Sequence, residues 1–208
     1  DGKIKGRISV SQDVGGNNMS PDLEFTSGNQ PWAAWVNQYH GFWRLYVQNT
    51  STSQTWEVTS AKRPLFTPDI IADKTGRVWV FWTGVQSGYD QIFVSYLEYG
   101  TWSRPETLTP DSSVPHFHPA VTLNEFGYPL AVWSSFTRTG YRLYSSSWTG
   151  SEWGVVSPLP HKPGSSDAEP AAVIWKDSIP VAAWTRSEGE GSHIYLTYLL
   201  GNEWSAPV

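Results

Sequence analysis

Residues 67 to 82 read Thr67-Pro-Asp-Ile-Ile-Ala-Asp-Lys-Thr-Gly-Arg-Val-Trp-Val-Phe-Trp82. The same pattern of residue types, though not the same sequence, returns three more times in the chain. The tryptophan that closes the stretch recurs at intervals of 47, 51 and 51 residues, as Trp35, Trp82, Trp133 and Trp184. A repeat of about 50 residues predicts one structural unit copied four times.

Other positions keep a constant distance from this repeat tryptophan. A proline stands 14 residues before it and an aliphatic residue 10 residues after it, with a second tryptophan 10 or 11 residues further on. The prolines are Pro21, Pro68, Pro119 and Pro170; the aliphatic residues are Leu45, Ile92, Leu143 and Ile194; the second tryptophans are Trp56, Trp102, Trp153 and Trp204. From the second tryptophan to the next proline the gap is 12, 17 and 17 residues. We therefore expect four rigid frames joined by adjustable loops.

Within each frame the segments between turns are too short for helices and rich in β-branched and aromatic residues. In the second unit a strand over 68–72 is followed by a turn at 73–76 and by an entirely apolar strand over 78–82, which we expect to be covered on both faces. A third strand over 91–95 alternates polar and apolar residues, and a fourth begins at 102. Four short antiparallel strands in a repeated unit are typical of a β-propeller blade.

The sequence predicts one all-β propeller domain over residues 1–208. Its parts are an outer strand in 1–13 and blades at 20–60, 67–111, 118–160 and 169–208. Residues 8–13 match 106–111, and the last repeat stops where its own outer strand should continue. The segment 7–12 is therefore predicted to complete the fourth blade beside residues 195–199 or 204, which would close a four-bladed ring. In the alternative, the four blades belong to a larger ring, completed by a longer chain or a second chain.

Composition excludes several classes of function. Eight of the 13 tryptophans occupy the two repeat positions, which marks them as core, and Trp82 and Trp133 are expected to be almost fully buried. The net charge is −5 and the 14 Lys and Arg are scattered singly, which argues against a nucleic-acid partner. No run approaches 18 apolar residues, so we predict no membrane span. Cysteine is absent, so the fold has no disulfides.

The stretch Gly100-Thr-Trp-Ser-Arg-Pro105 adds a second signature to the one in 67–82. Together they resemble the BNR-type repeats of the sialidase-like β-propeller superfamily, over essentially the whole chain. The resemblance implies propeller architecture but not activity. The Asp-box Ser-x-Asp-x-Gly-x-Thr-Trp is missing, with only a loose echo at 73–79, and so are the Arg-Ile-Pro motif and the three-arginine cluster of sialidases. Sialidase activity is therefore not expected.

The loops between blades and those between the second and third strands should emerge on one face, where propellers place binding sites. Residues beside each proline would ring the entrance of the central channel. Asp22, Asp69 and Glu169 are the catalytic candidates there, because a trio of carboxylates resembles the layout of propeller glycosidases. In the alternative, these groups only cap turns and solvate the channel. Neither a metal nor a cofactor is predicted, since His116 and His118 lack a recognisable ligand spacing.

The second set of candidates lies in the loops after each repeat tryptophan, where aromatic rings stand beside glycines and polar residues. The predicted ligand-binding residues are Tyr39, His40, Trp43, Tyr89, Asp90, Arg138 and Tyr141, with His118 at the channel entrance. Exposed rings and hydrogen-bonding groups suit sugars, and they suit protein surfaces nearly as well. In the alternative, these rings pack against the loop of the neighbouring blade.

We thus predict a non-catalytic propeller module of a secreted or surface protein that binds a glycan or a surface protein through one loop face. A glycoside-active enzyme using the channel carboxylates is the alternative. A structural role comes third, with self-association or additional blades from a longer chain.

Overall fold

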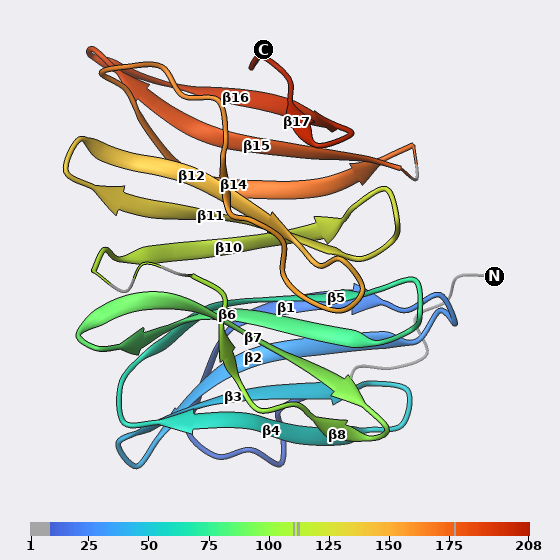
Figure 1. The fold of residues 1–208 in the computed structure, drawn as a ribbon. Coiled ribbons are helices and arrows are strands. Elements are labelled where there is room, and N and C mark those ends of the chain that lie inside the picture. Colours follow the sequence, from blue (N-terminus) through green and yellow to red (C-terminus); the bar gives the residue numbers. More distant parts are fainter. Residues whose placement is uncertain (1–8, 110, 112, 177) are drawn as a thin grey trace.

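The computed structural model describes residues 9–109, 111, 113–176 and 178–208, which form four antiparallel sheets that follow one another along the chain (Figure 1). The first sheet contains β1 (Asn17–Phe25), β2 (Pro31–Tyr39), β3 (Phe42–Asn49) and β4 (Gln54–Ala61), and the second β5 (Leu65–Ala72), β6 (Val78–Gln86), β7 (Tyr89–Glu98), β8 (Thr101–Trp102) and β9 (Glu106–Thr107). The third contains β10 (His116–Leu123), β11 (Pro129–Thr137), β12 (Gly140–Ser147) and β13 (Ser157–Pro158), and the fourth β14 (Ser166–Trp175), β15 (Ile179–Glu188), β16 (Gly191–Leu200) and β17 (Glu203–Trp204).

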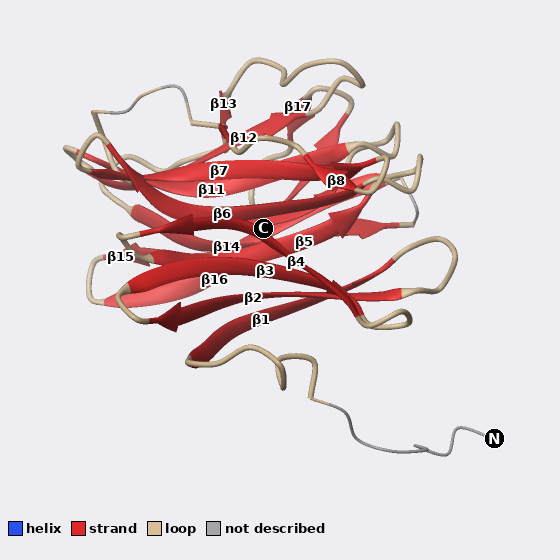
Figure 2. Cartoon of the chain, turned by 90° about the horizontal axis from the view of Figure 1, so that it is seen from below, coloured by secondary structure: helices blue, strands red, loops and turns tan. Residues whose placement is uncertain are grey.

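All regular structure in the described part is strand (Figure 2), so no helix there could cross a membrane. Each sheet is one blade, and the strands of a blade follow one another in chain order, except that β9 pairs with β7 in the second blade. The inner strands β1, β5, β10 and β14 contact one another in that sequence. The fold is an all-β propeller of four-stranded blades, as the repeat predicts.

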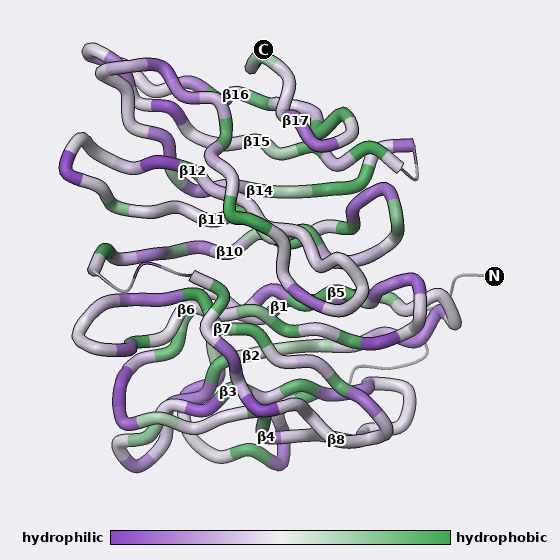
Figure 3. Tube along the Cα trace, in the orientation of Figure 1, coloured by the Kyte–Doolittle hydropathy of each residue, from purple (hydrophilic) through white to green (hydrophobic). Residues whose placement is uncertain are grey.

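The second strand of a blade fills two interfaces because its side chains alternate between the faces of the sheet. In β6, Val80 and Trp82 pack against the first blade, while Trp79 and Phe81 pack against the third. The strand is buried from Val78 to Gly84, which confirms that it is covered on both faces. The predicted burial of Trp82 and Trp133 is confirmed as well, at 2% and 0% exposed. Apolar residues accordingly gather in the strands of Figure 3.

Every inner strand is interrupted by a β-bulge at its repeat proline. The residue before the proline has a positive φ in all four blades: Ser20 at 51°, Thr67 at 44°, His118 at 51° and Glu169 at 56°. Such angles are unfavourable for residues other than glycine, and a bulge breaks the ladder of hydrogen bonds to the neighbouring strand. In the first two blades the bulge allows the residue that follows the proline, Asp22 or Asp69, to bind the next blade.

The outer strands differ more than the repeat predicts. The first blade has a complete outer strand, β4, whereas the predicted strand from 102 onward is split into β8 and β9. Pro105 lies between these two pieces and has no N–H to donate to a ladder. In the fourth blade β17 is followed by Val208, which exchanges two hydrogen bonds of 3.0 Å with Leu196 of β16.

The prediction that residues 7–12 complete the fourth blade is wrong for the part that the structure describes. The carbonyl of Val10 accepts a hydrogen bond from Gln48 Nε2 (3.1 Å), and that of Gly15 accepts one from Asn37 Nδ2 (2.8 Å). Both amide side chains are buried in the first blade and need acceptors, and this segment supplies them. The predicted residues 7 and 8 lie outside the described part.

Candidate functional site

Two of the three predicted channel carboxylates are adjacent. Asp22 and Asp69 follow the bulges of β1 and β5, and each binds the main chain of the next blade. Asp22 Oδ2 accepts the N–H of Ile70 (2.8 Å), and Asp69 Oδ2 accepts the N–H of Val121 (2.9 Å). In the third and fourth blades alanine occupies the equivalent position. These carboxylates therefore join the first three blades to one another.

The third carboxylate candidate, Glu169, is not part of this pair. Its side chain is exposed, and its main-chain N–H donates to Ser134 Oγ (3.2 Å). Burial raises the pKa of Asp69 well above its ordinary value, and the negative charges of Asp22 and, more weakly, Glu24 raise it further. The hydrogen bond from Val121 acts in the opposite direction. The site favours a protonated Asp69 beside Asp22.

This pKa shift predicts a pH dependence that Asp69→Asn should remove. An acid whose pKa is raised in the folded state binds its proton more tightly there, so stability falls as pH rises from about 4, the unfolded value, through the raised folded pKa. Urea unfolding at a series of pH values in this range measures the free energy of unfolding, which should change less with pH in Asp69→Asn than in the wild type. The exposed Glu125→Gln serves as the control and should leave the slope unchanged. An unchanged slope in Asp69→Asn would contradict the shift.

The predicted ligand-binding residues lie mostly at hairpin tips of different blades. Tyr39 and Tyr89 are about half exposed, at 43% and 44%, and the Tyr39 ring lies 3.9 Å from that of His40. Arg138 is exposed in the third hairpin, and His118 is exposed at its bulge. Within the described residues no hydrogen bond or ring contact joins these hairpins.

Three other candidates are partly buried. Trp43 packs on the core between the first two blades, with its ring 5.9 Å from that of Phe66. Tyr141 packs against Phe136, at 5.0 Å between ring centroids, and Phe117, at 6.2 Å. Asp90 is also partly buried, which raises its pKa. Trp43 thus packs against a strand of the neighbouring blade, whereas the rings around Tyr141 belong to its own blade.

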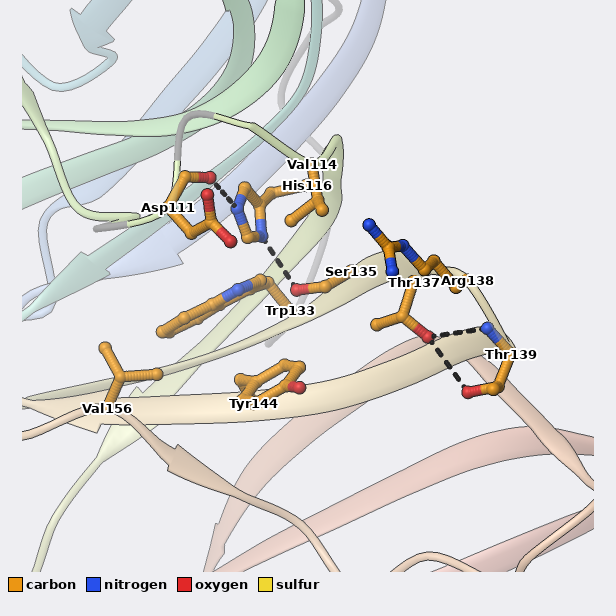
Figure 4. A pocket seen from close by; sticks show the side chains of 10 residues that line it. All are labelled: Asp111, Val114, His116, Trp133, Ser135, Thr137, Arg138, Thr139, Tyr144 and Val156. Atoms are coloured by element: carbon orange, nitrogen blue, oxygen red, sulfur yellow. Dashed lines mark hydrogen bonds between the residues drawn. The ribbon is translucent and has the colours of Figure 1, made fainter.

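A cavity of about 480 Å³ lies between the third blade and the connection that leads into it from the second blade (Figure 4). Its lining is formed by Asp111, Val114, His116, Trp133, Ser135, Thr137, Arg138, Thr139, Tyr144 and Val156. Arg138 is the only ligand-binding residue predicted from the sequence that belongs to it. The cavity combines aromatic and aliphatic surface with a carboxylate, a guanidinium and hydroxyls.

His116 holds the connection against the third blade. Its Nε2 lies 2.8 Å from the carbonyl of Asp111, and its Nδ1 lies 2.7 Å from Ser135 Oγ. Because a carbonyl can only accept, Nε2 carries the proton, and the Ser135 hydroxyl must donate to Nδ1. Burial lowers the pKa of His116, which favours this neutral form. Among the described residues, none donates a hydrogen bond to the remaining lone pairs of Ser135 Oγ.

The repeat tryptophan of the third blade differs from its equivalents in the first and last blades. Trp35 and Trp184 donate their indole N–H, at 3.0 Å, to a side chain three residues before the repeat proline, Asn18 and Asp167 respectively. In the third blade that position is His116, which is bonded elsewhere. The Nε1–H of Trp133 is therefore buried, and none of the described residues accepts a hydrogen bond from it. A buried, unpaired donor costs about 1–3 kcal/mol. This nitrogen is covered from solvent, so a water or ligand oxygen would reach and stabilise it only after the lining shifts.

Sequence reasoning missed Trp133 as a site residue because its repeat position marked it as core. The sequence did contain a signal that the partner of the repeat tryptophan changes, since the position three residues before the proline is Asn, Leu, His and Asp in successive blades.

Within the described ranges, no group of three His, Cys, Asp or Glu could hold a metal ion.

Comparison with known proteins shows the fold and nothing finer. No family model matches the chain, and no curated protein sequence matches it. Solved structures do match. The propeller architecture is shared with proteins of known structure.

One of these is an α-L-arabinanase from Penicillium chrysogenum in complex with arabinobiose, with a TM-score of 0.62 and 13% identity over 89% of this chain and 63% of that one. A protein of unknown function from Dyadobacter fermentans gives a TM-score of 0.68 and 13% identity over 92% and 68%. An α-L-arabinofuranosidase of Fusarium graminearum with arabinobiose gives a TM-score of 0.61 and 12% identity, over 89% of this chain and 63% of that one. The propeller thus spans slightly under two thirds of the length of both arabinose-related proteins. These matches do not single out the sialidase-like superfamily.

Proposed function

We propose that this propeller is a non-catalytic carbohydrate-binding module and that the cavity beside Trp133 is its sugar site. The observation that carries the proposal is a cavity of about 480 Å³ whose lining includes Trp133, since the buried indole N–H of that residue bonds to none of the described residues. That volume lies within the usual range of about 300–1,000 Å³ for small-molecule pockets. Two proteins of similar fold were solved with arabinobiose, which supports a carbohydrate as the class of ligand.

The lining provides the contacts that a sugar needs. Tyr144, Val114 and Val156 offer apolar surface for the C–H face of a ring. Trp133 Nε1–H is covered from solvent, so it could donate to a sugar oxygen once the lining shifts, and Ser135 Oγ could then accept from a sugar hydroxyl. Figure 4 places Arg138 and Thr137 at one side of the cavity, where the guanidinium can add charge-assisted hydrogen bonds.

The channel carboxylates support a non-catalytic role. A glycosidase needs two carboxyl groups that flank the scissile bond, one as acid and one as base or nucleophile. Asp22 and Asp69 each use one oxygen on a main-chain N–H of the next blade, and Glu169 stands apart from them. We infer a structural role for the pair. A carbohydrate ligand also accords with the extracellular or cell-surface location expected from the sequence.

Calorimetric titration with arabinobiose and longer arabino-oligosaccharides tests the proposal, followed by a wider glycan array. Arg138→Ala should weaken binding roughly tenfold or more, since a hydrogen bond to a charged group is worth about 1.5–3 kcal/mol. Arg104→Ala, an exposed arginine outside the cavity, is the matched control and should bind like the wild type.

Trp133→Phe removes the indole N–H and should also weaken binding, whereas Trp82→Phe, equally buried at its repeat position, should lose stability but keep affinity. Absence of binding to every glycan, or equal affinity in Trp133→Phe, would contradict the sugar site. Hydrolysis that disappears in Asp69→Asn would instead support the enzyme alternative.

A further inference from the structure

The outward face of the fourth blade exposes a position that is core in every other blade. The repeat aliphatic residue is 0% exposed at Leu45 and Ile92 and 3% at Leu143, but 72% at Ile194. Leu45 and Ile92 lie in core clusters shared with the next blade, and so does Leu143. Ile194 therefore lies on a face that is built like a blade interface and has no described blade against it.

In the part of the chain that the structure describes, the main chain of β16 beside Ile194 also lacks the hydrogen bond that its equivalents make in the second and third blades. In the second and third blades the carbonyls of Ile92 and Leu143 accept the N–H of Leu108 (2.8 Å) and Leu159 (2.9 Å). The side chains of Leu108 and Leu159 are buried in the core. In the fourth blade the ladder reaches Leu196, and among the described residues none donates to the carbonyl of Ile194. Val173 and Trp175 of β14 are also exposed, at 59% and 45%.

The first blade shows the complementary exposure on its opposite face. The residue two positions after the repeat proline is buried at Ile70 (2%) and Val121 (7%), where it packs on the preceding blade, but Leu23 is 58% exposed. Phe25, two residues further along β1, is 52% exposed. The segment from Ser9 to Gly16 binds the first blade through Gln48 and Asn37 and leaves these two side chains uncovered.

These two faces are the halves of one interface. Each blade contact within the chain joins the face bearing the repeat aliphatic residue to the face of the next blade that bears the residue two positions after the proline. We propose that two copies of this chain associate head to tail, with the Ile194 face of one copy on the Leu23 face of the other. The new contact would repeat the interface that already joins neighbouring blades within one copy.

The described N-terminal segment fits the same arrangement. Val10 corresponds to Leu108 in the alignment of residues 8–13 with 106–111, and it contacts the first blade. In the head-to-tail pair, Val10 of one copy would therefore lie near the open edge at Ile194 of the other. Contacts that join unlike surfaces form closed rings or filaments, depending on the rotation between copies.

Sedimentation velocity of the wild-type chain from low to high micromolar concentration tests the proposal. We expect a concentration-dependent shift to dimers or larger assemblies. Ile194→Lys and Leu23→Lys should each raise the dissociation constant at least tenfold, because either substitution places an unpaired charge in the interface. Val155→Lys is the matched control, since Val155 is 90% exposed in the third blade, and it should associate like the wild type. Circular dichroism would verify that each variant is folded.

An equimolar mixture of Ile194→Lys and Leu23→Lys distinguishes head-to-tail contact from a symmetric one. Each variant keeps one intact half, so the mixture should form heterodimers although neither variant associates alone. A Leu23→Lys variant that still dimerises by itself would overturn the head-to-tail arrangement in favour of contact between two Ile194 faces. A wild-type chain that stays monomeric throughout would overturn the proposal altogether. Because no sugar is present, these outcomes do not depend on the proposed function.

Discussion

Replacing Trp79 by alanine is expected to lower the free energy of unfolding by about 3–5 kcal/mol, the usual cost of removing a buried tryptophan. The side chain is 0% exposed and packs between the second and third blades, with ring centroids 4.7 Å from Tyr96 and 5.1 Å from Trp148. Its Nε1 donates to Asp73 Oδ2 at 2.9 Å, so truncation also leaves a buried carboxylate oxygen without this donor. Denaturant unfolding followed by circular dichroism measures the loss.

Trp175→Ala is the matched control for this prediction. Trp175 is 45% exposed at the open face of the fourth blade, where its ring contacts Tyr198. Its truncation should cost less than about 1 kcal/mol, because surface substitutions remove little buried area. Similar losses for the two variants would mean that the second-strand tryptophans do not hold the blades together.

Asp167→Ala is expected to cost a similar amount, about 3–5 kcal/mol, for an electrostatic reason. Asp167 is 2% exposed and accepts hydrogen bonds from Arg186 Nε (2.6 Å) and Nη2 (3.1 Å), with further bonds to Trp184 and His161. Arg186 is itself buried, at 4% exposed. Removal of the carboxylate leaves a buried guanidinium without its counter-charge, which is more costly than loss of the pair as a whole.

The double variant Asp167→Ala/Arg186→Met separates this cause from simple loss of packing. It should recover part of the stability, because the uncompensated charge is removed together with its partner. Glu57→Ala provides a surface comparison: the Arg44–Glu57 pair, at 3.4 Å, is partly exposed, and its loss should cost about 0–1 kcal/mol. If the double variant is less stable than Asp167→Ala alone, the buried charge is not the source of the effect.

The candidate site could be predicted only in part. Sequence reasoning pointed to the hairpin of the third blade and to Arg138, which lines the cavity. It expected Asp22, Asp69 and Glu169 to converge, and the structure brings together only Asp22 and Asp69, both of which follow a repeat proline. It missed Trp133, since the availability of its N–H depends on His116 binding Ser135 and Asp111 instead. Which partner His116 binds depends on the positions of Ser135 and Asp111 in the folded structure.

The exposure of the aromatic loop residues was equally beyond the sequence. Tyr39 and Tyr89 are exposed, whereas Trp43 and Tyr141 pack on rings supplied by other strands, although all four stand in similar glycine-containing loops. Local composition predicts that an aromatic ring lies near a turn. It does not predict which residues of other strands cover that ring.

By itself the sequence determined the repeating blade, its strand order and its core. A constant spacing from Pro68 to Trp82 to Ile92, repeated in each blade, specifies the alternation that buries one face of each strand against the neighbouring blade. Only the tertiary structure decided that Ser9–Gly16 lies on the first blade and that Ile194 remains exposed. The physical reason is that identical repeat positions become core or surface according to whether another blade covers them, and a repeat cannot encode its own neighbour.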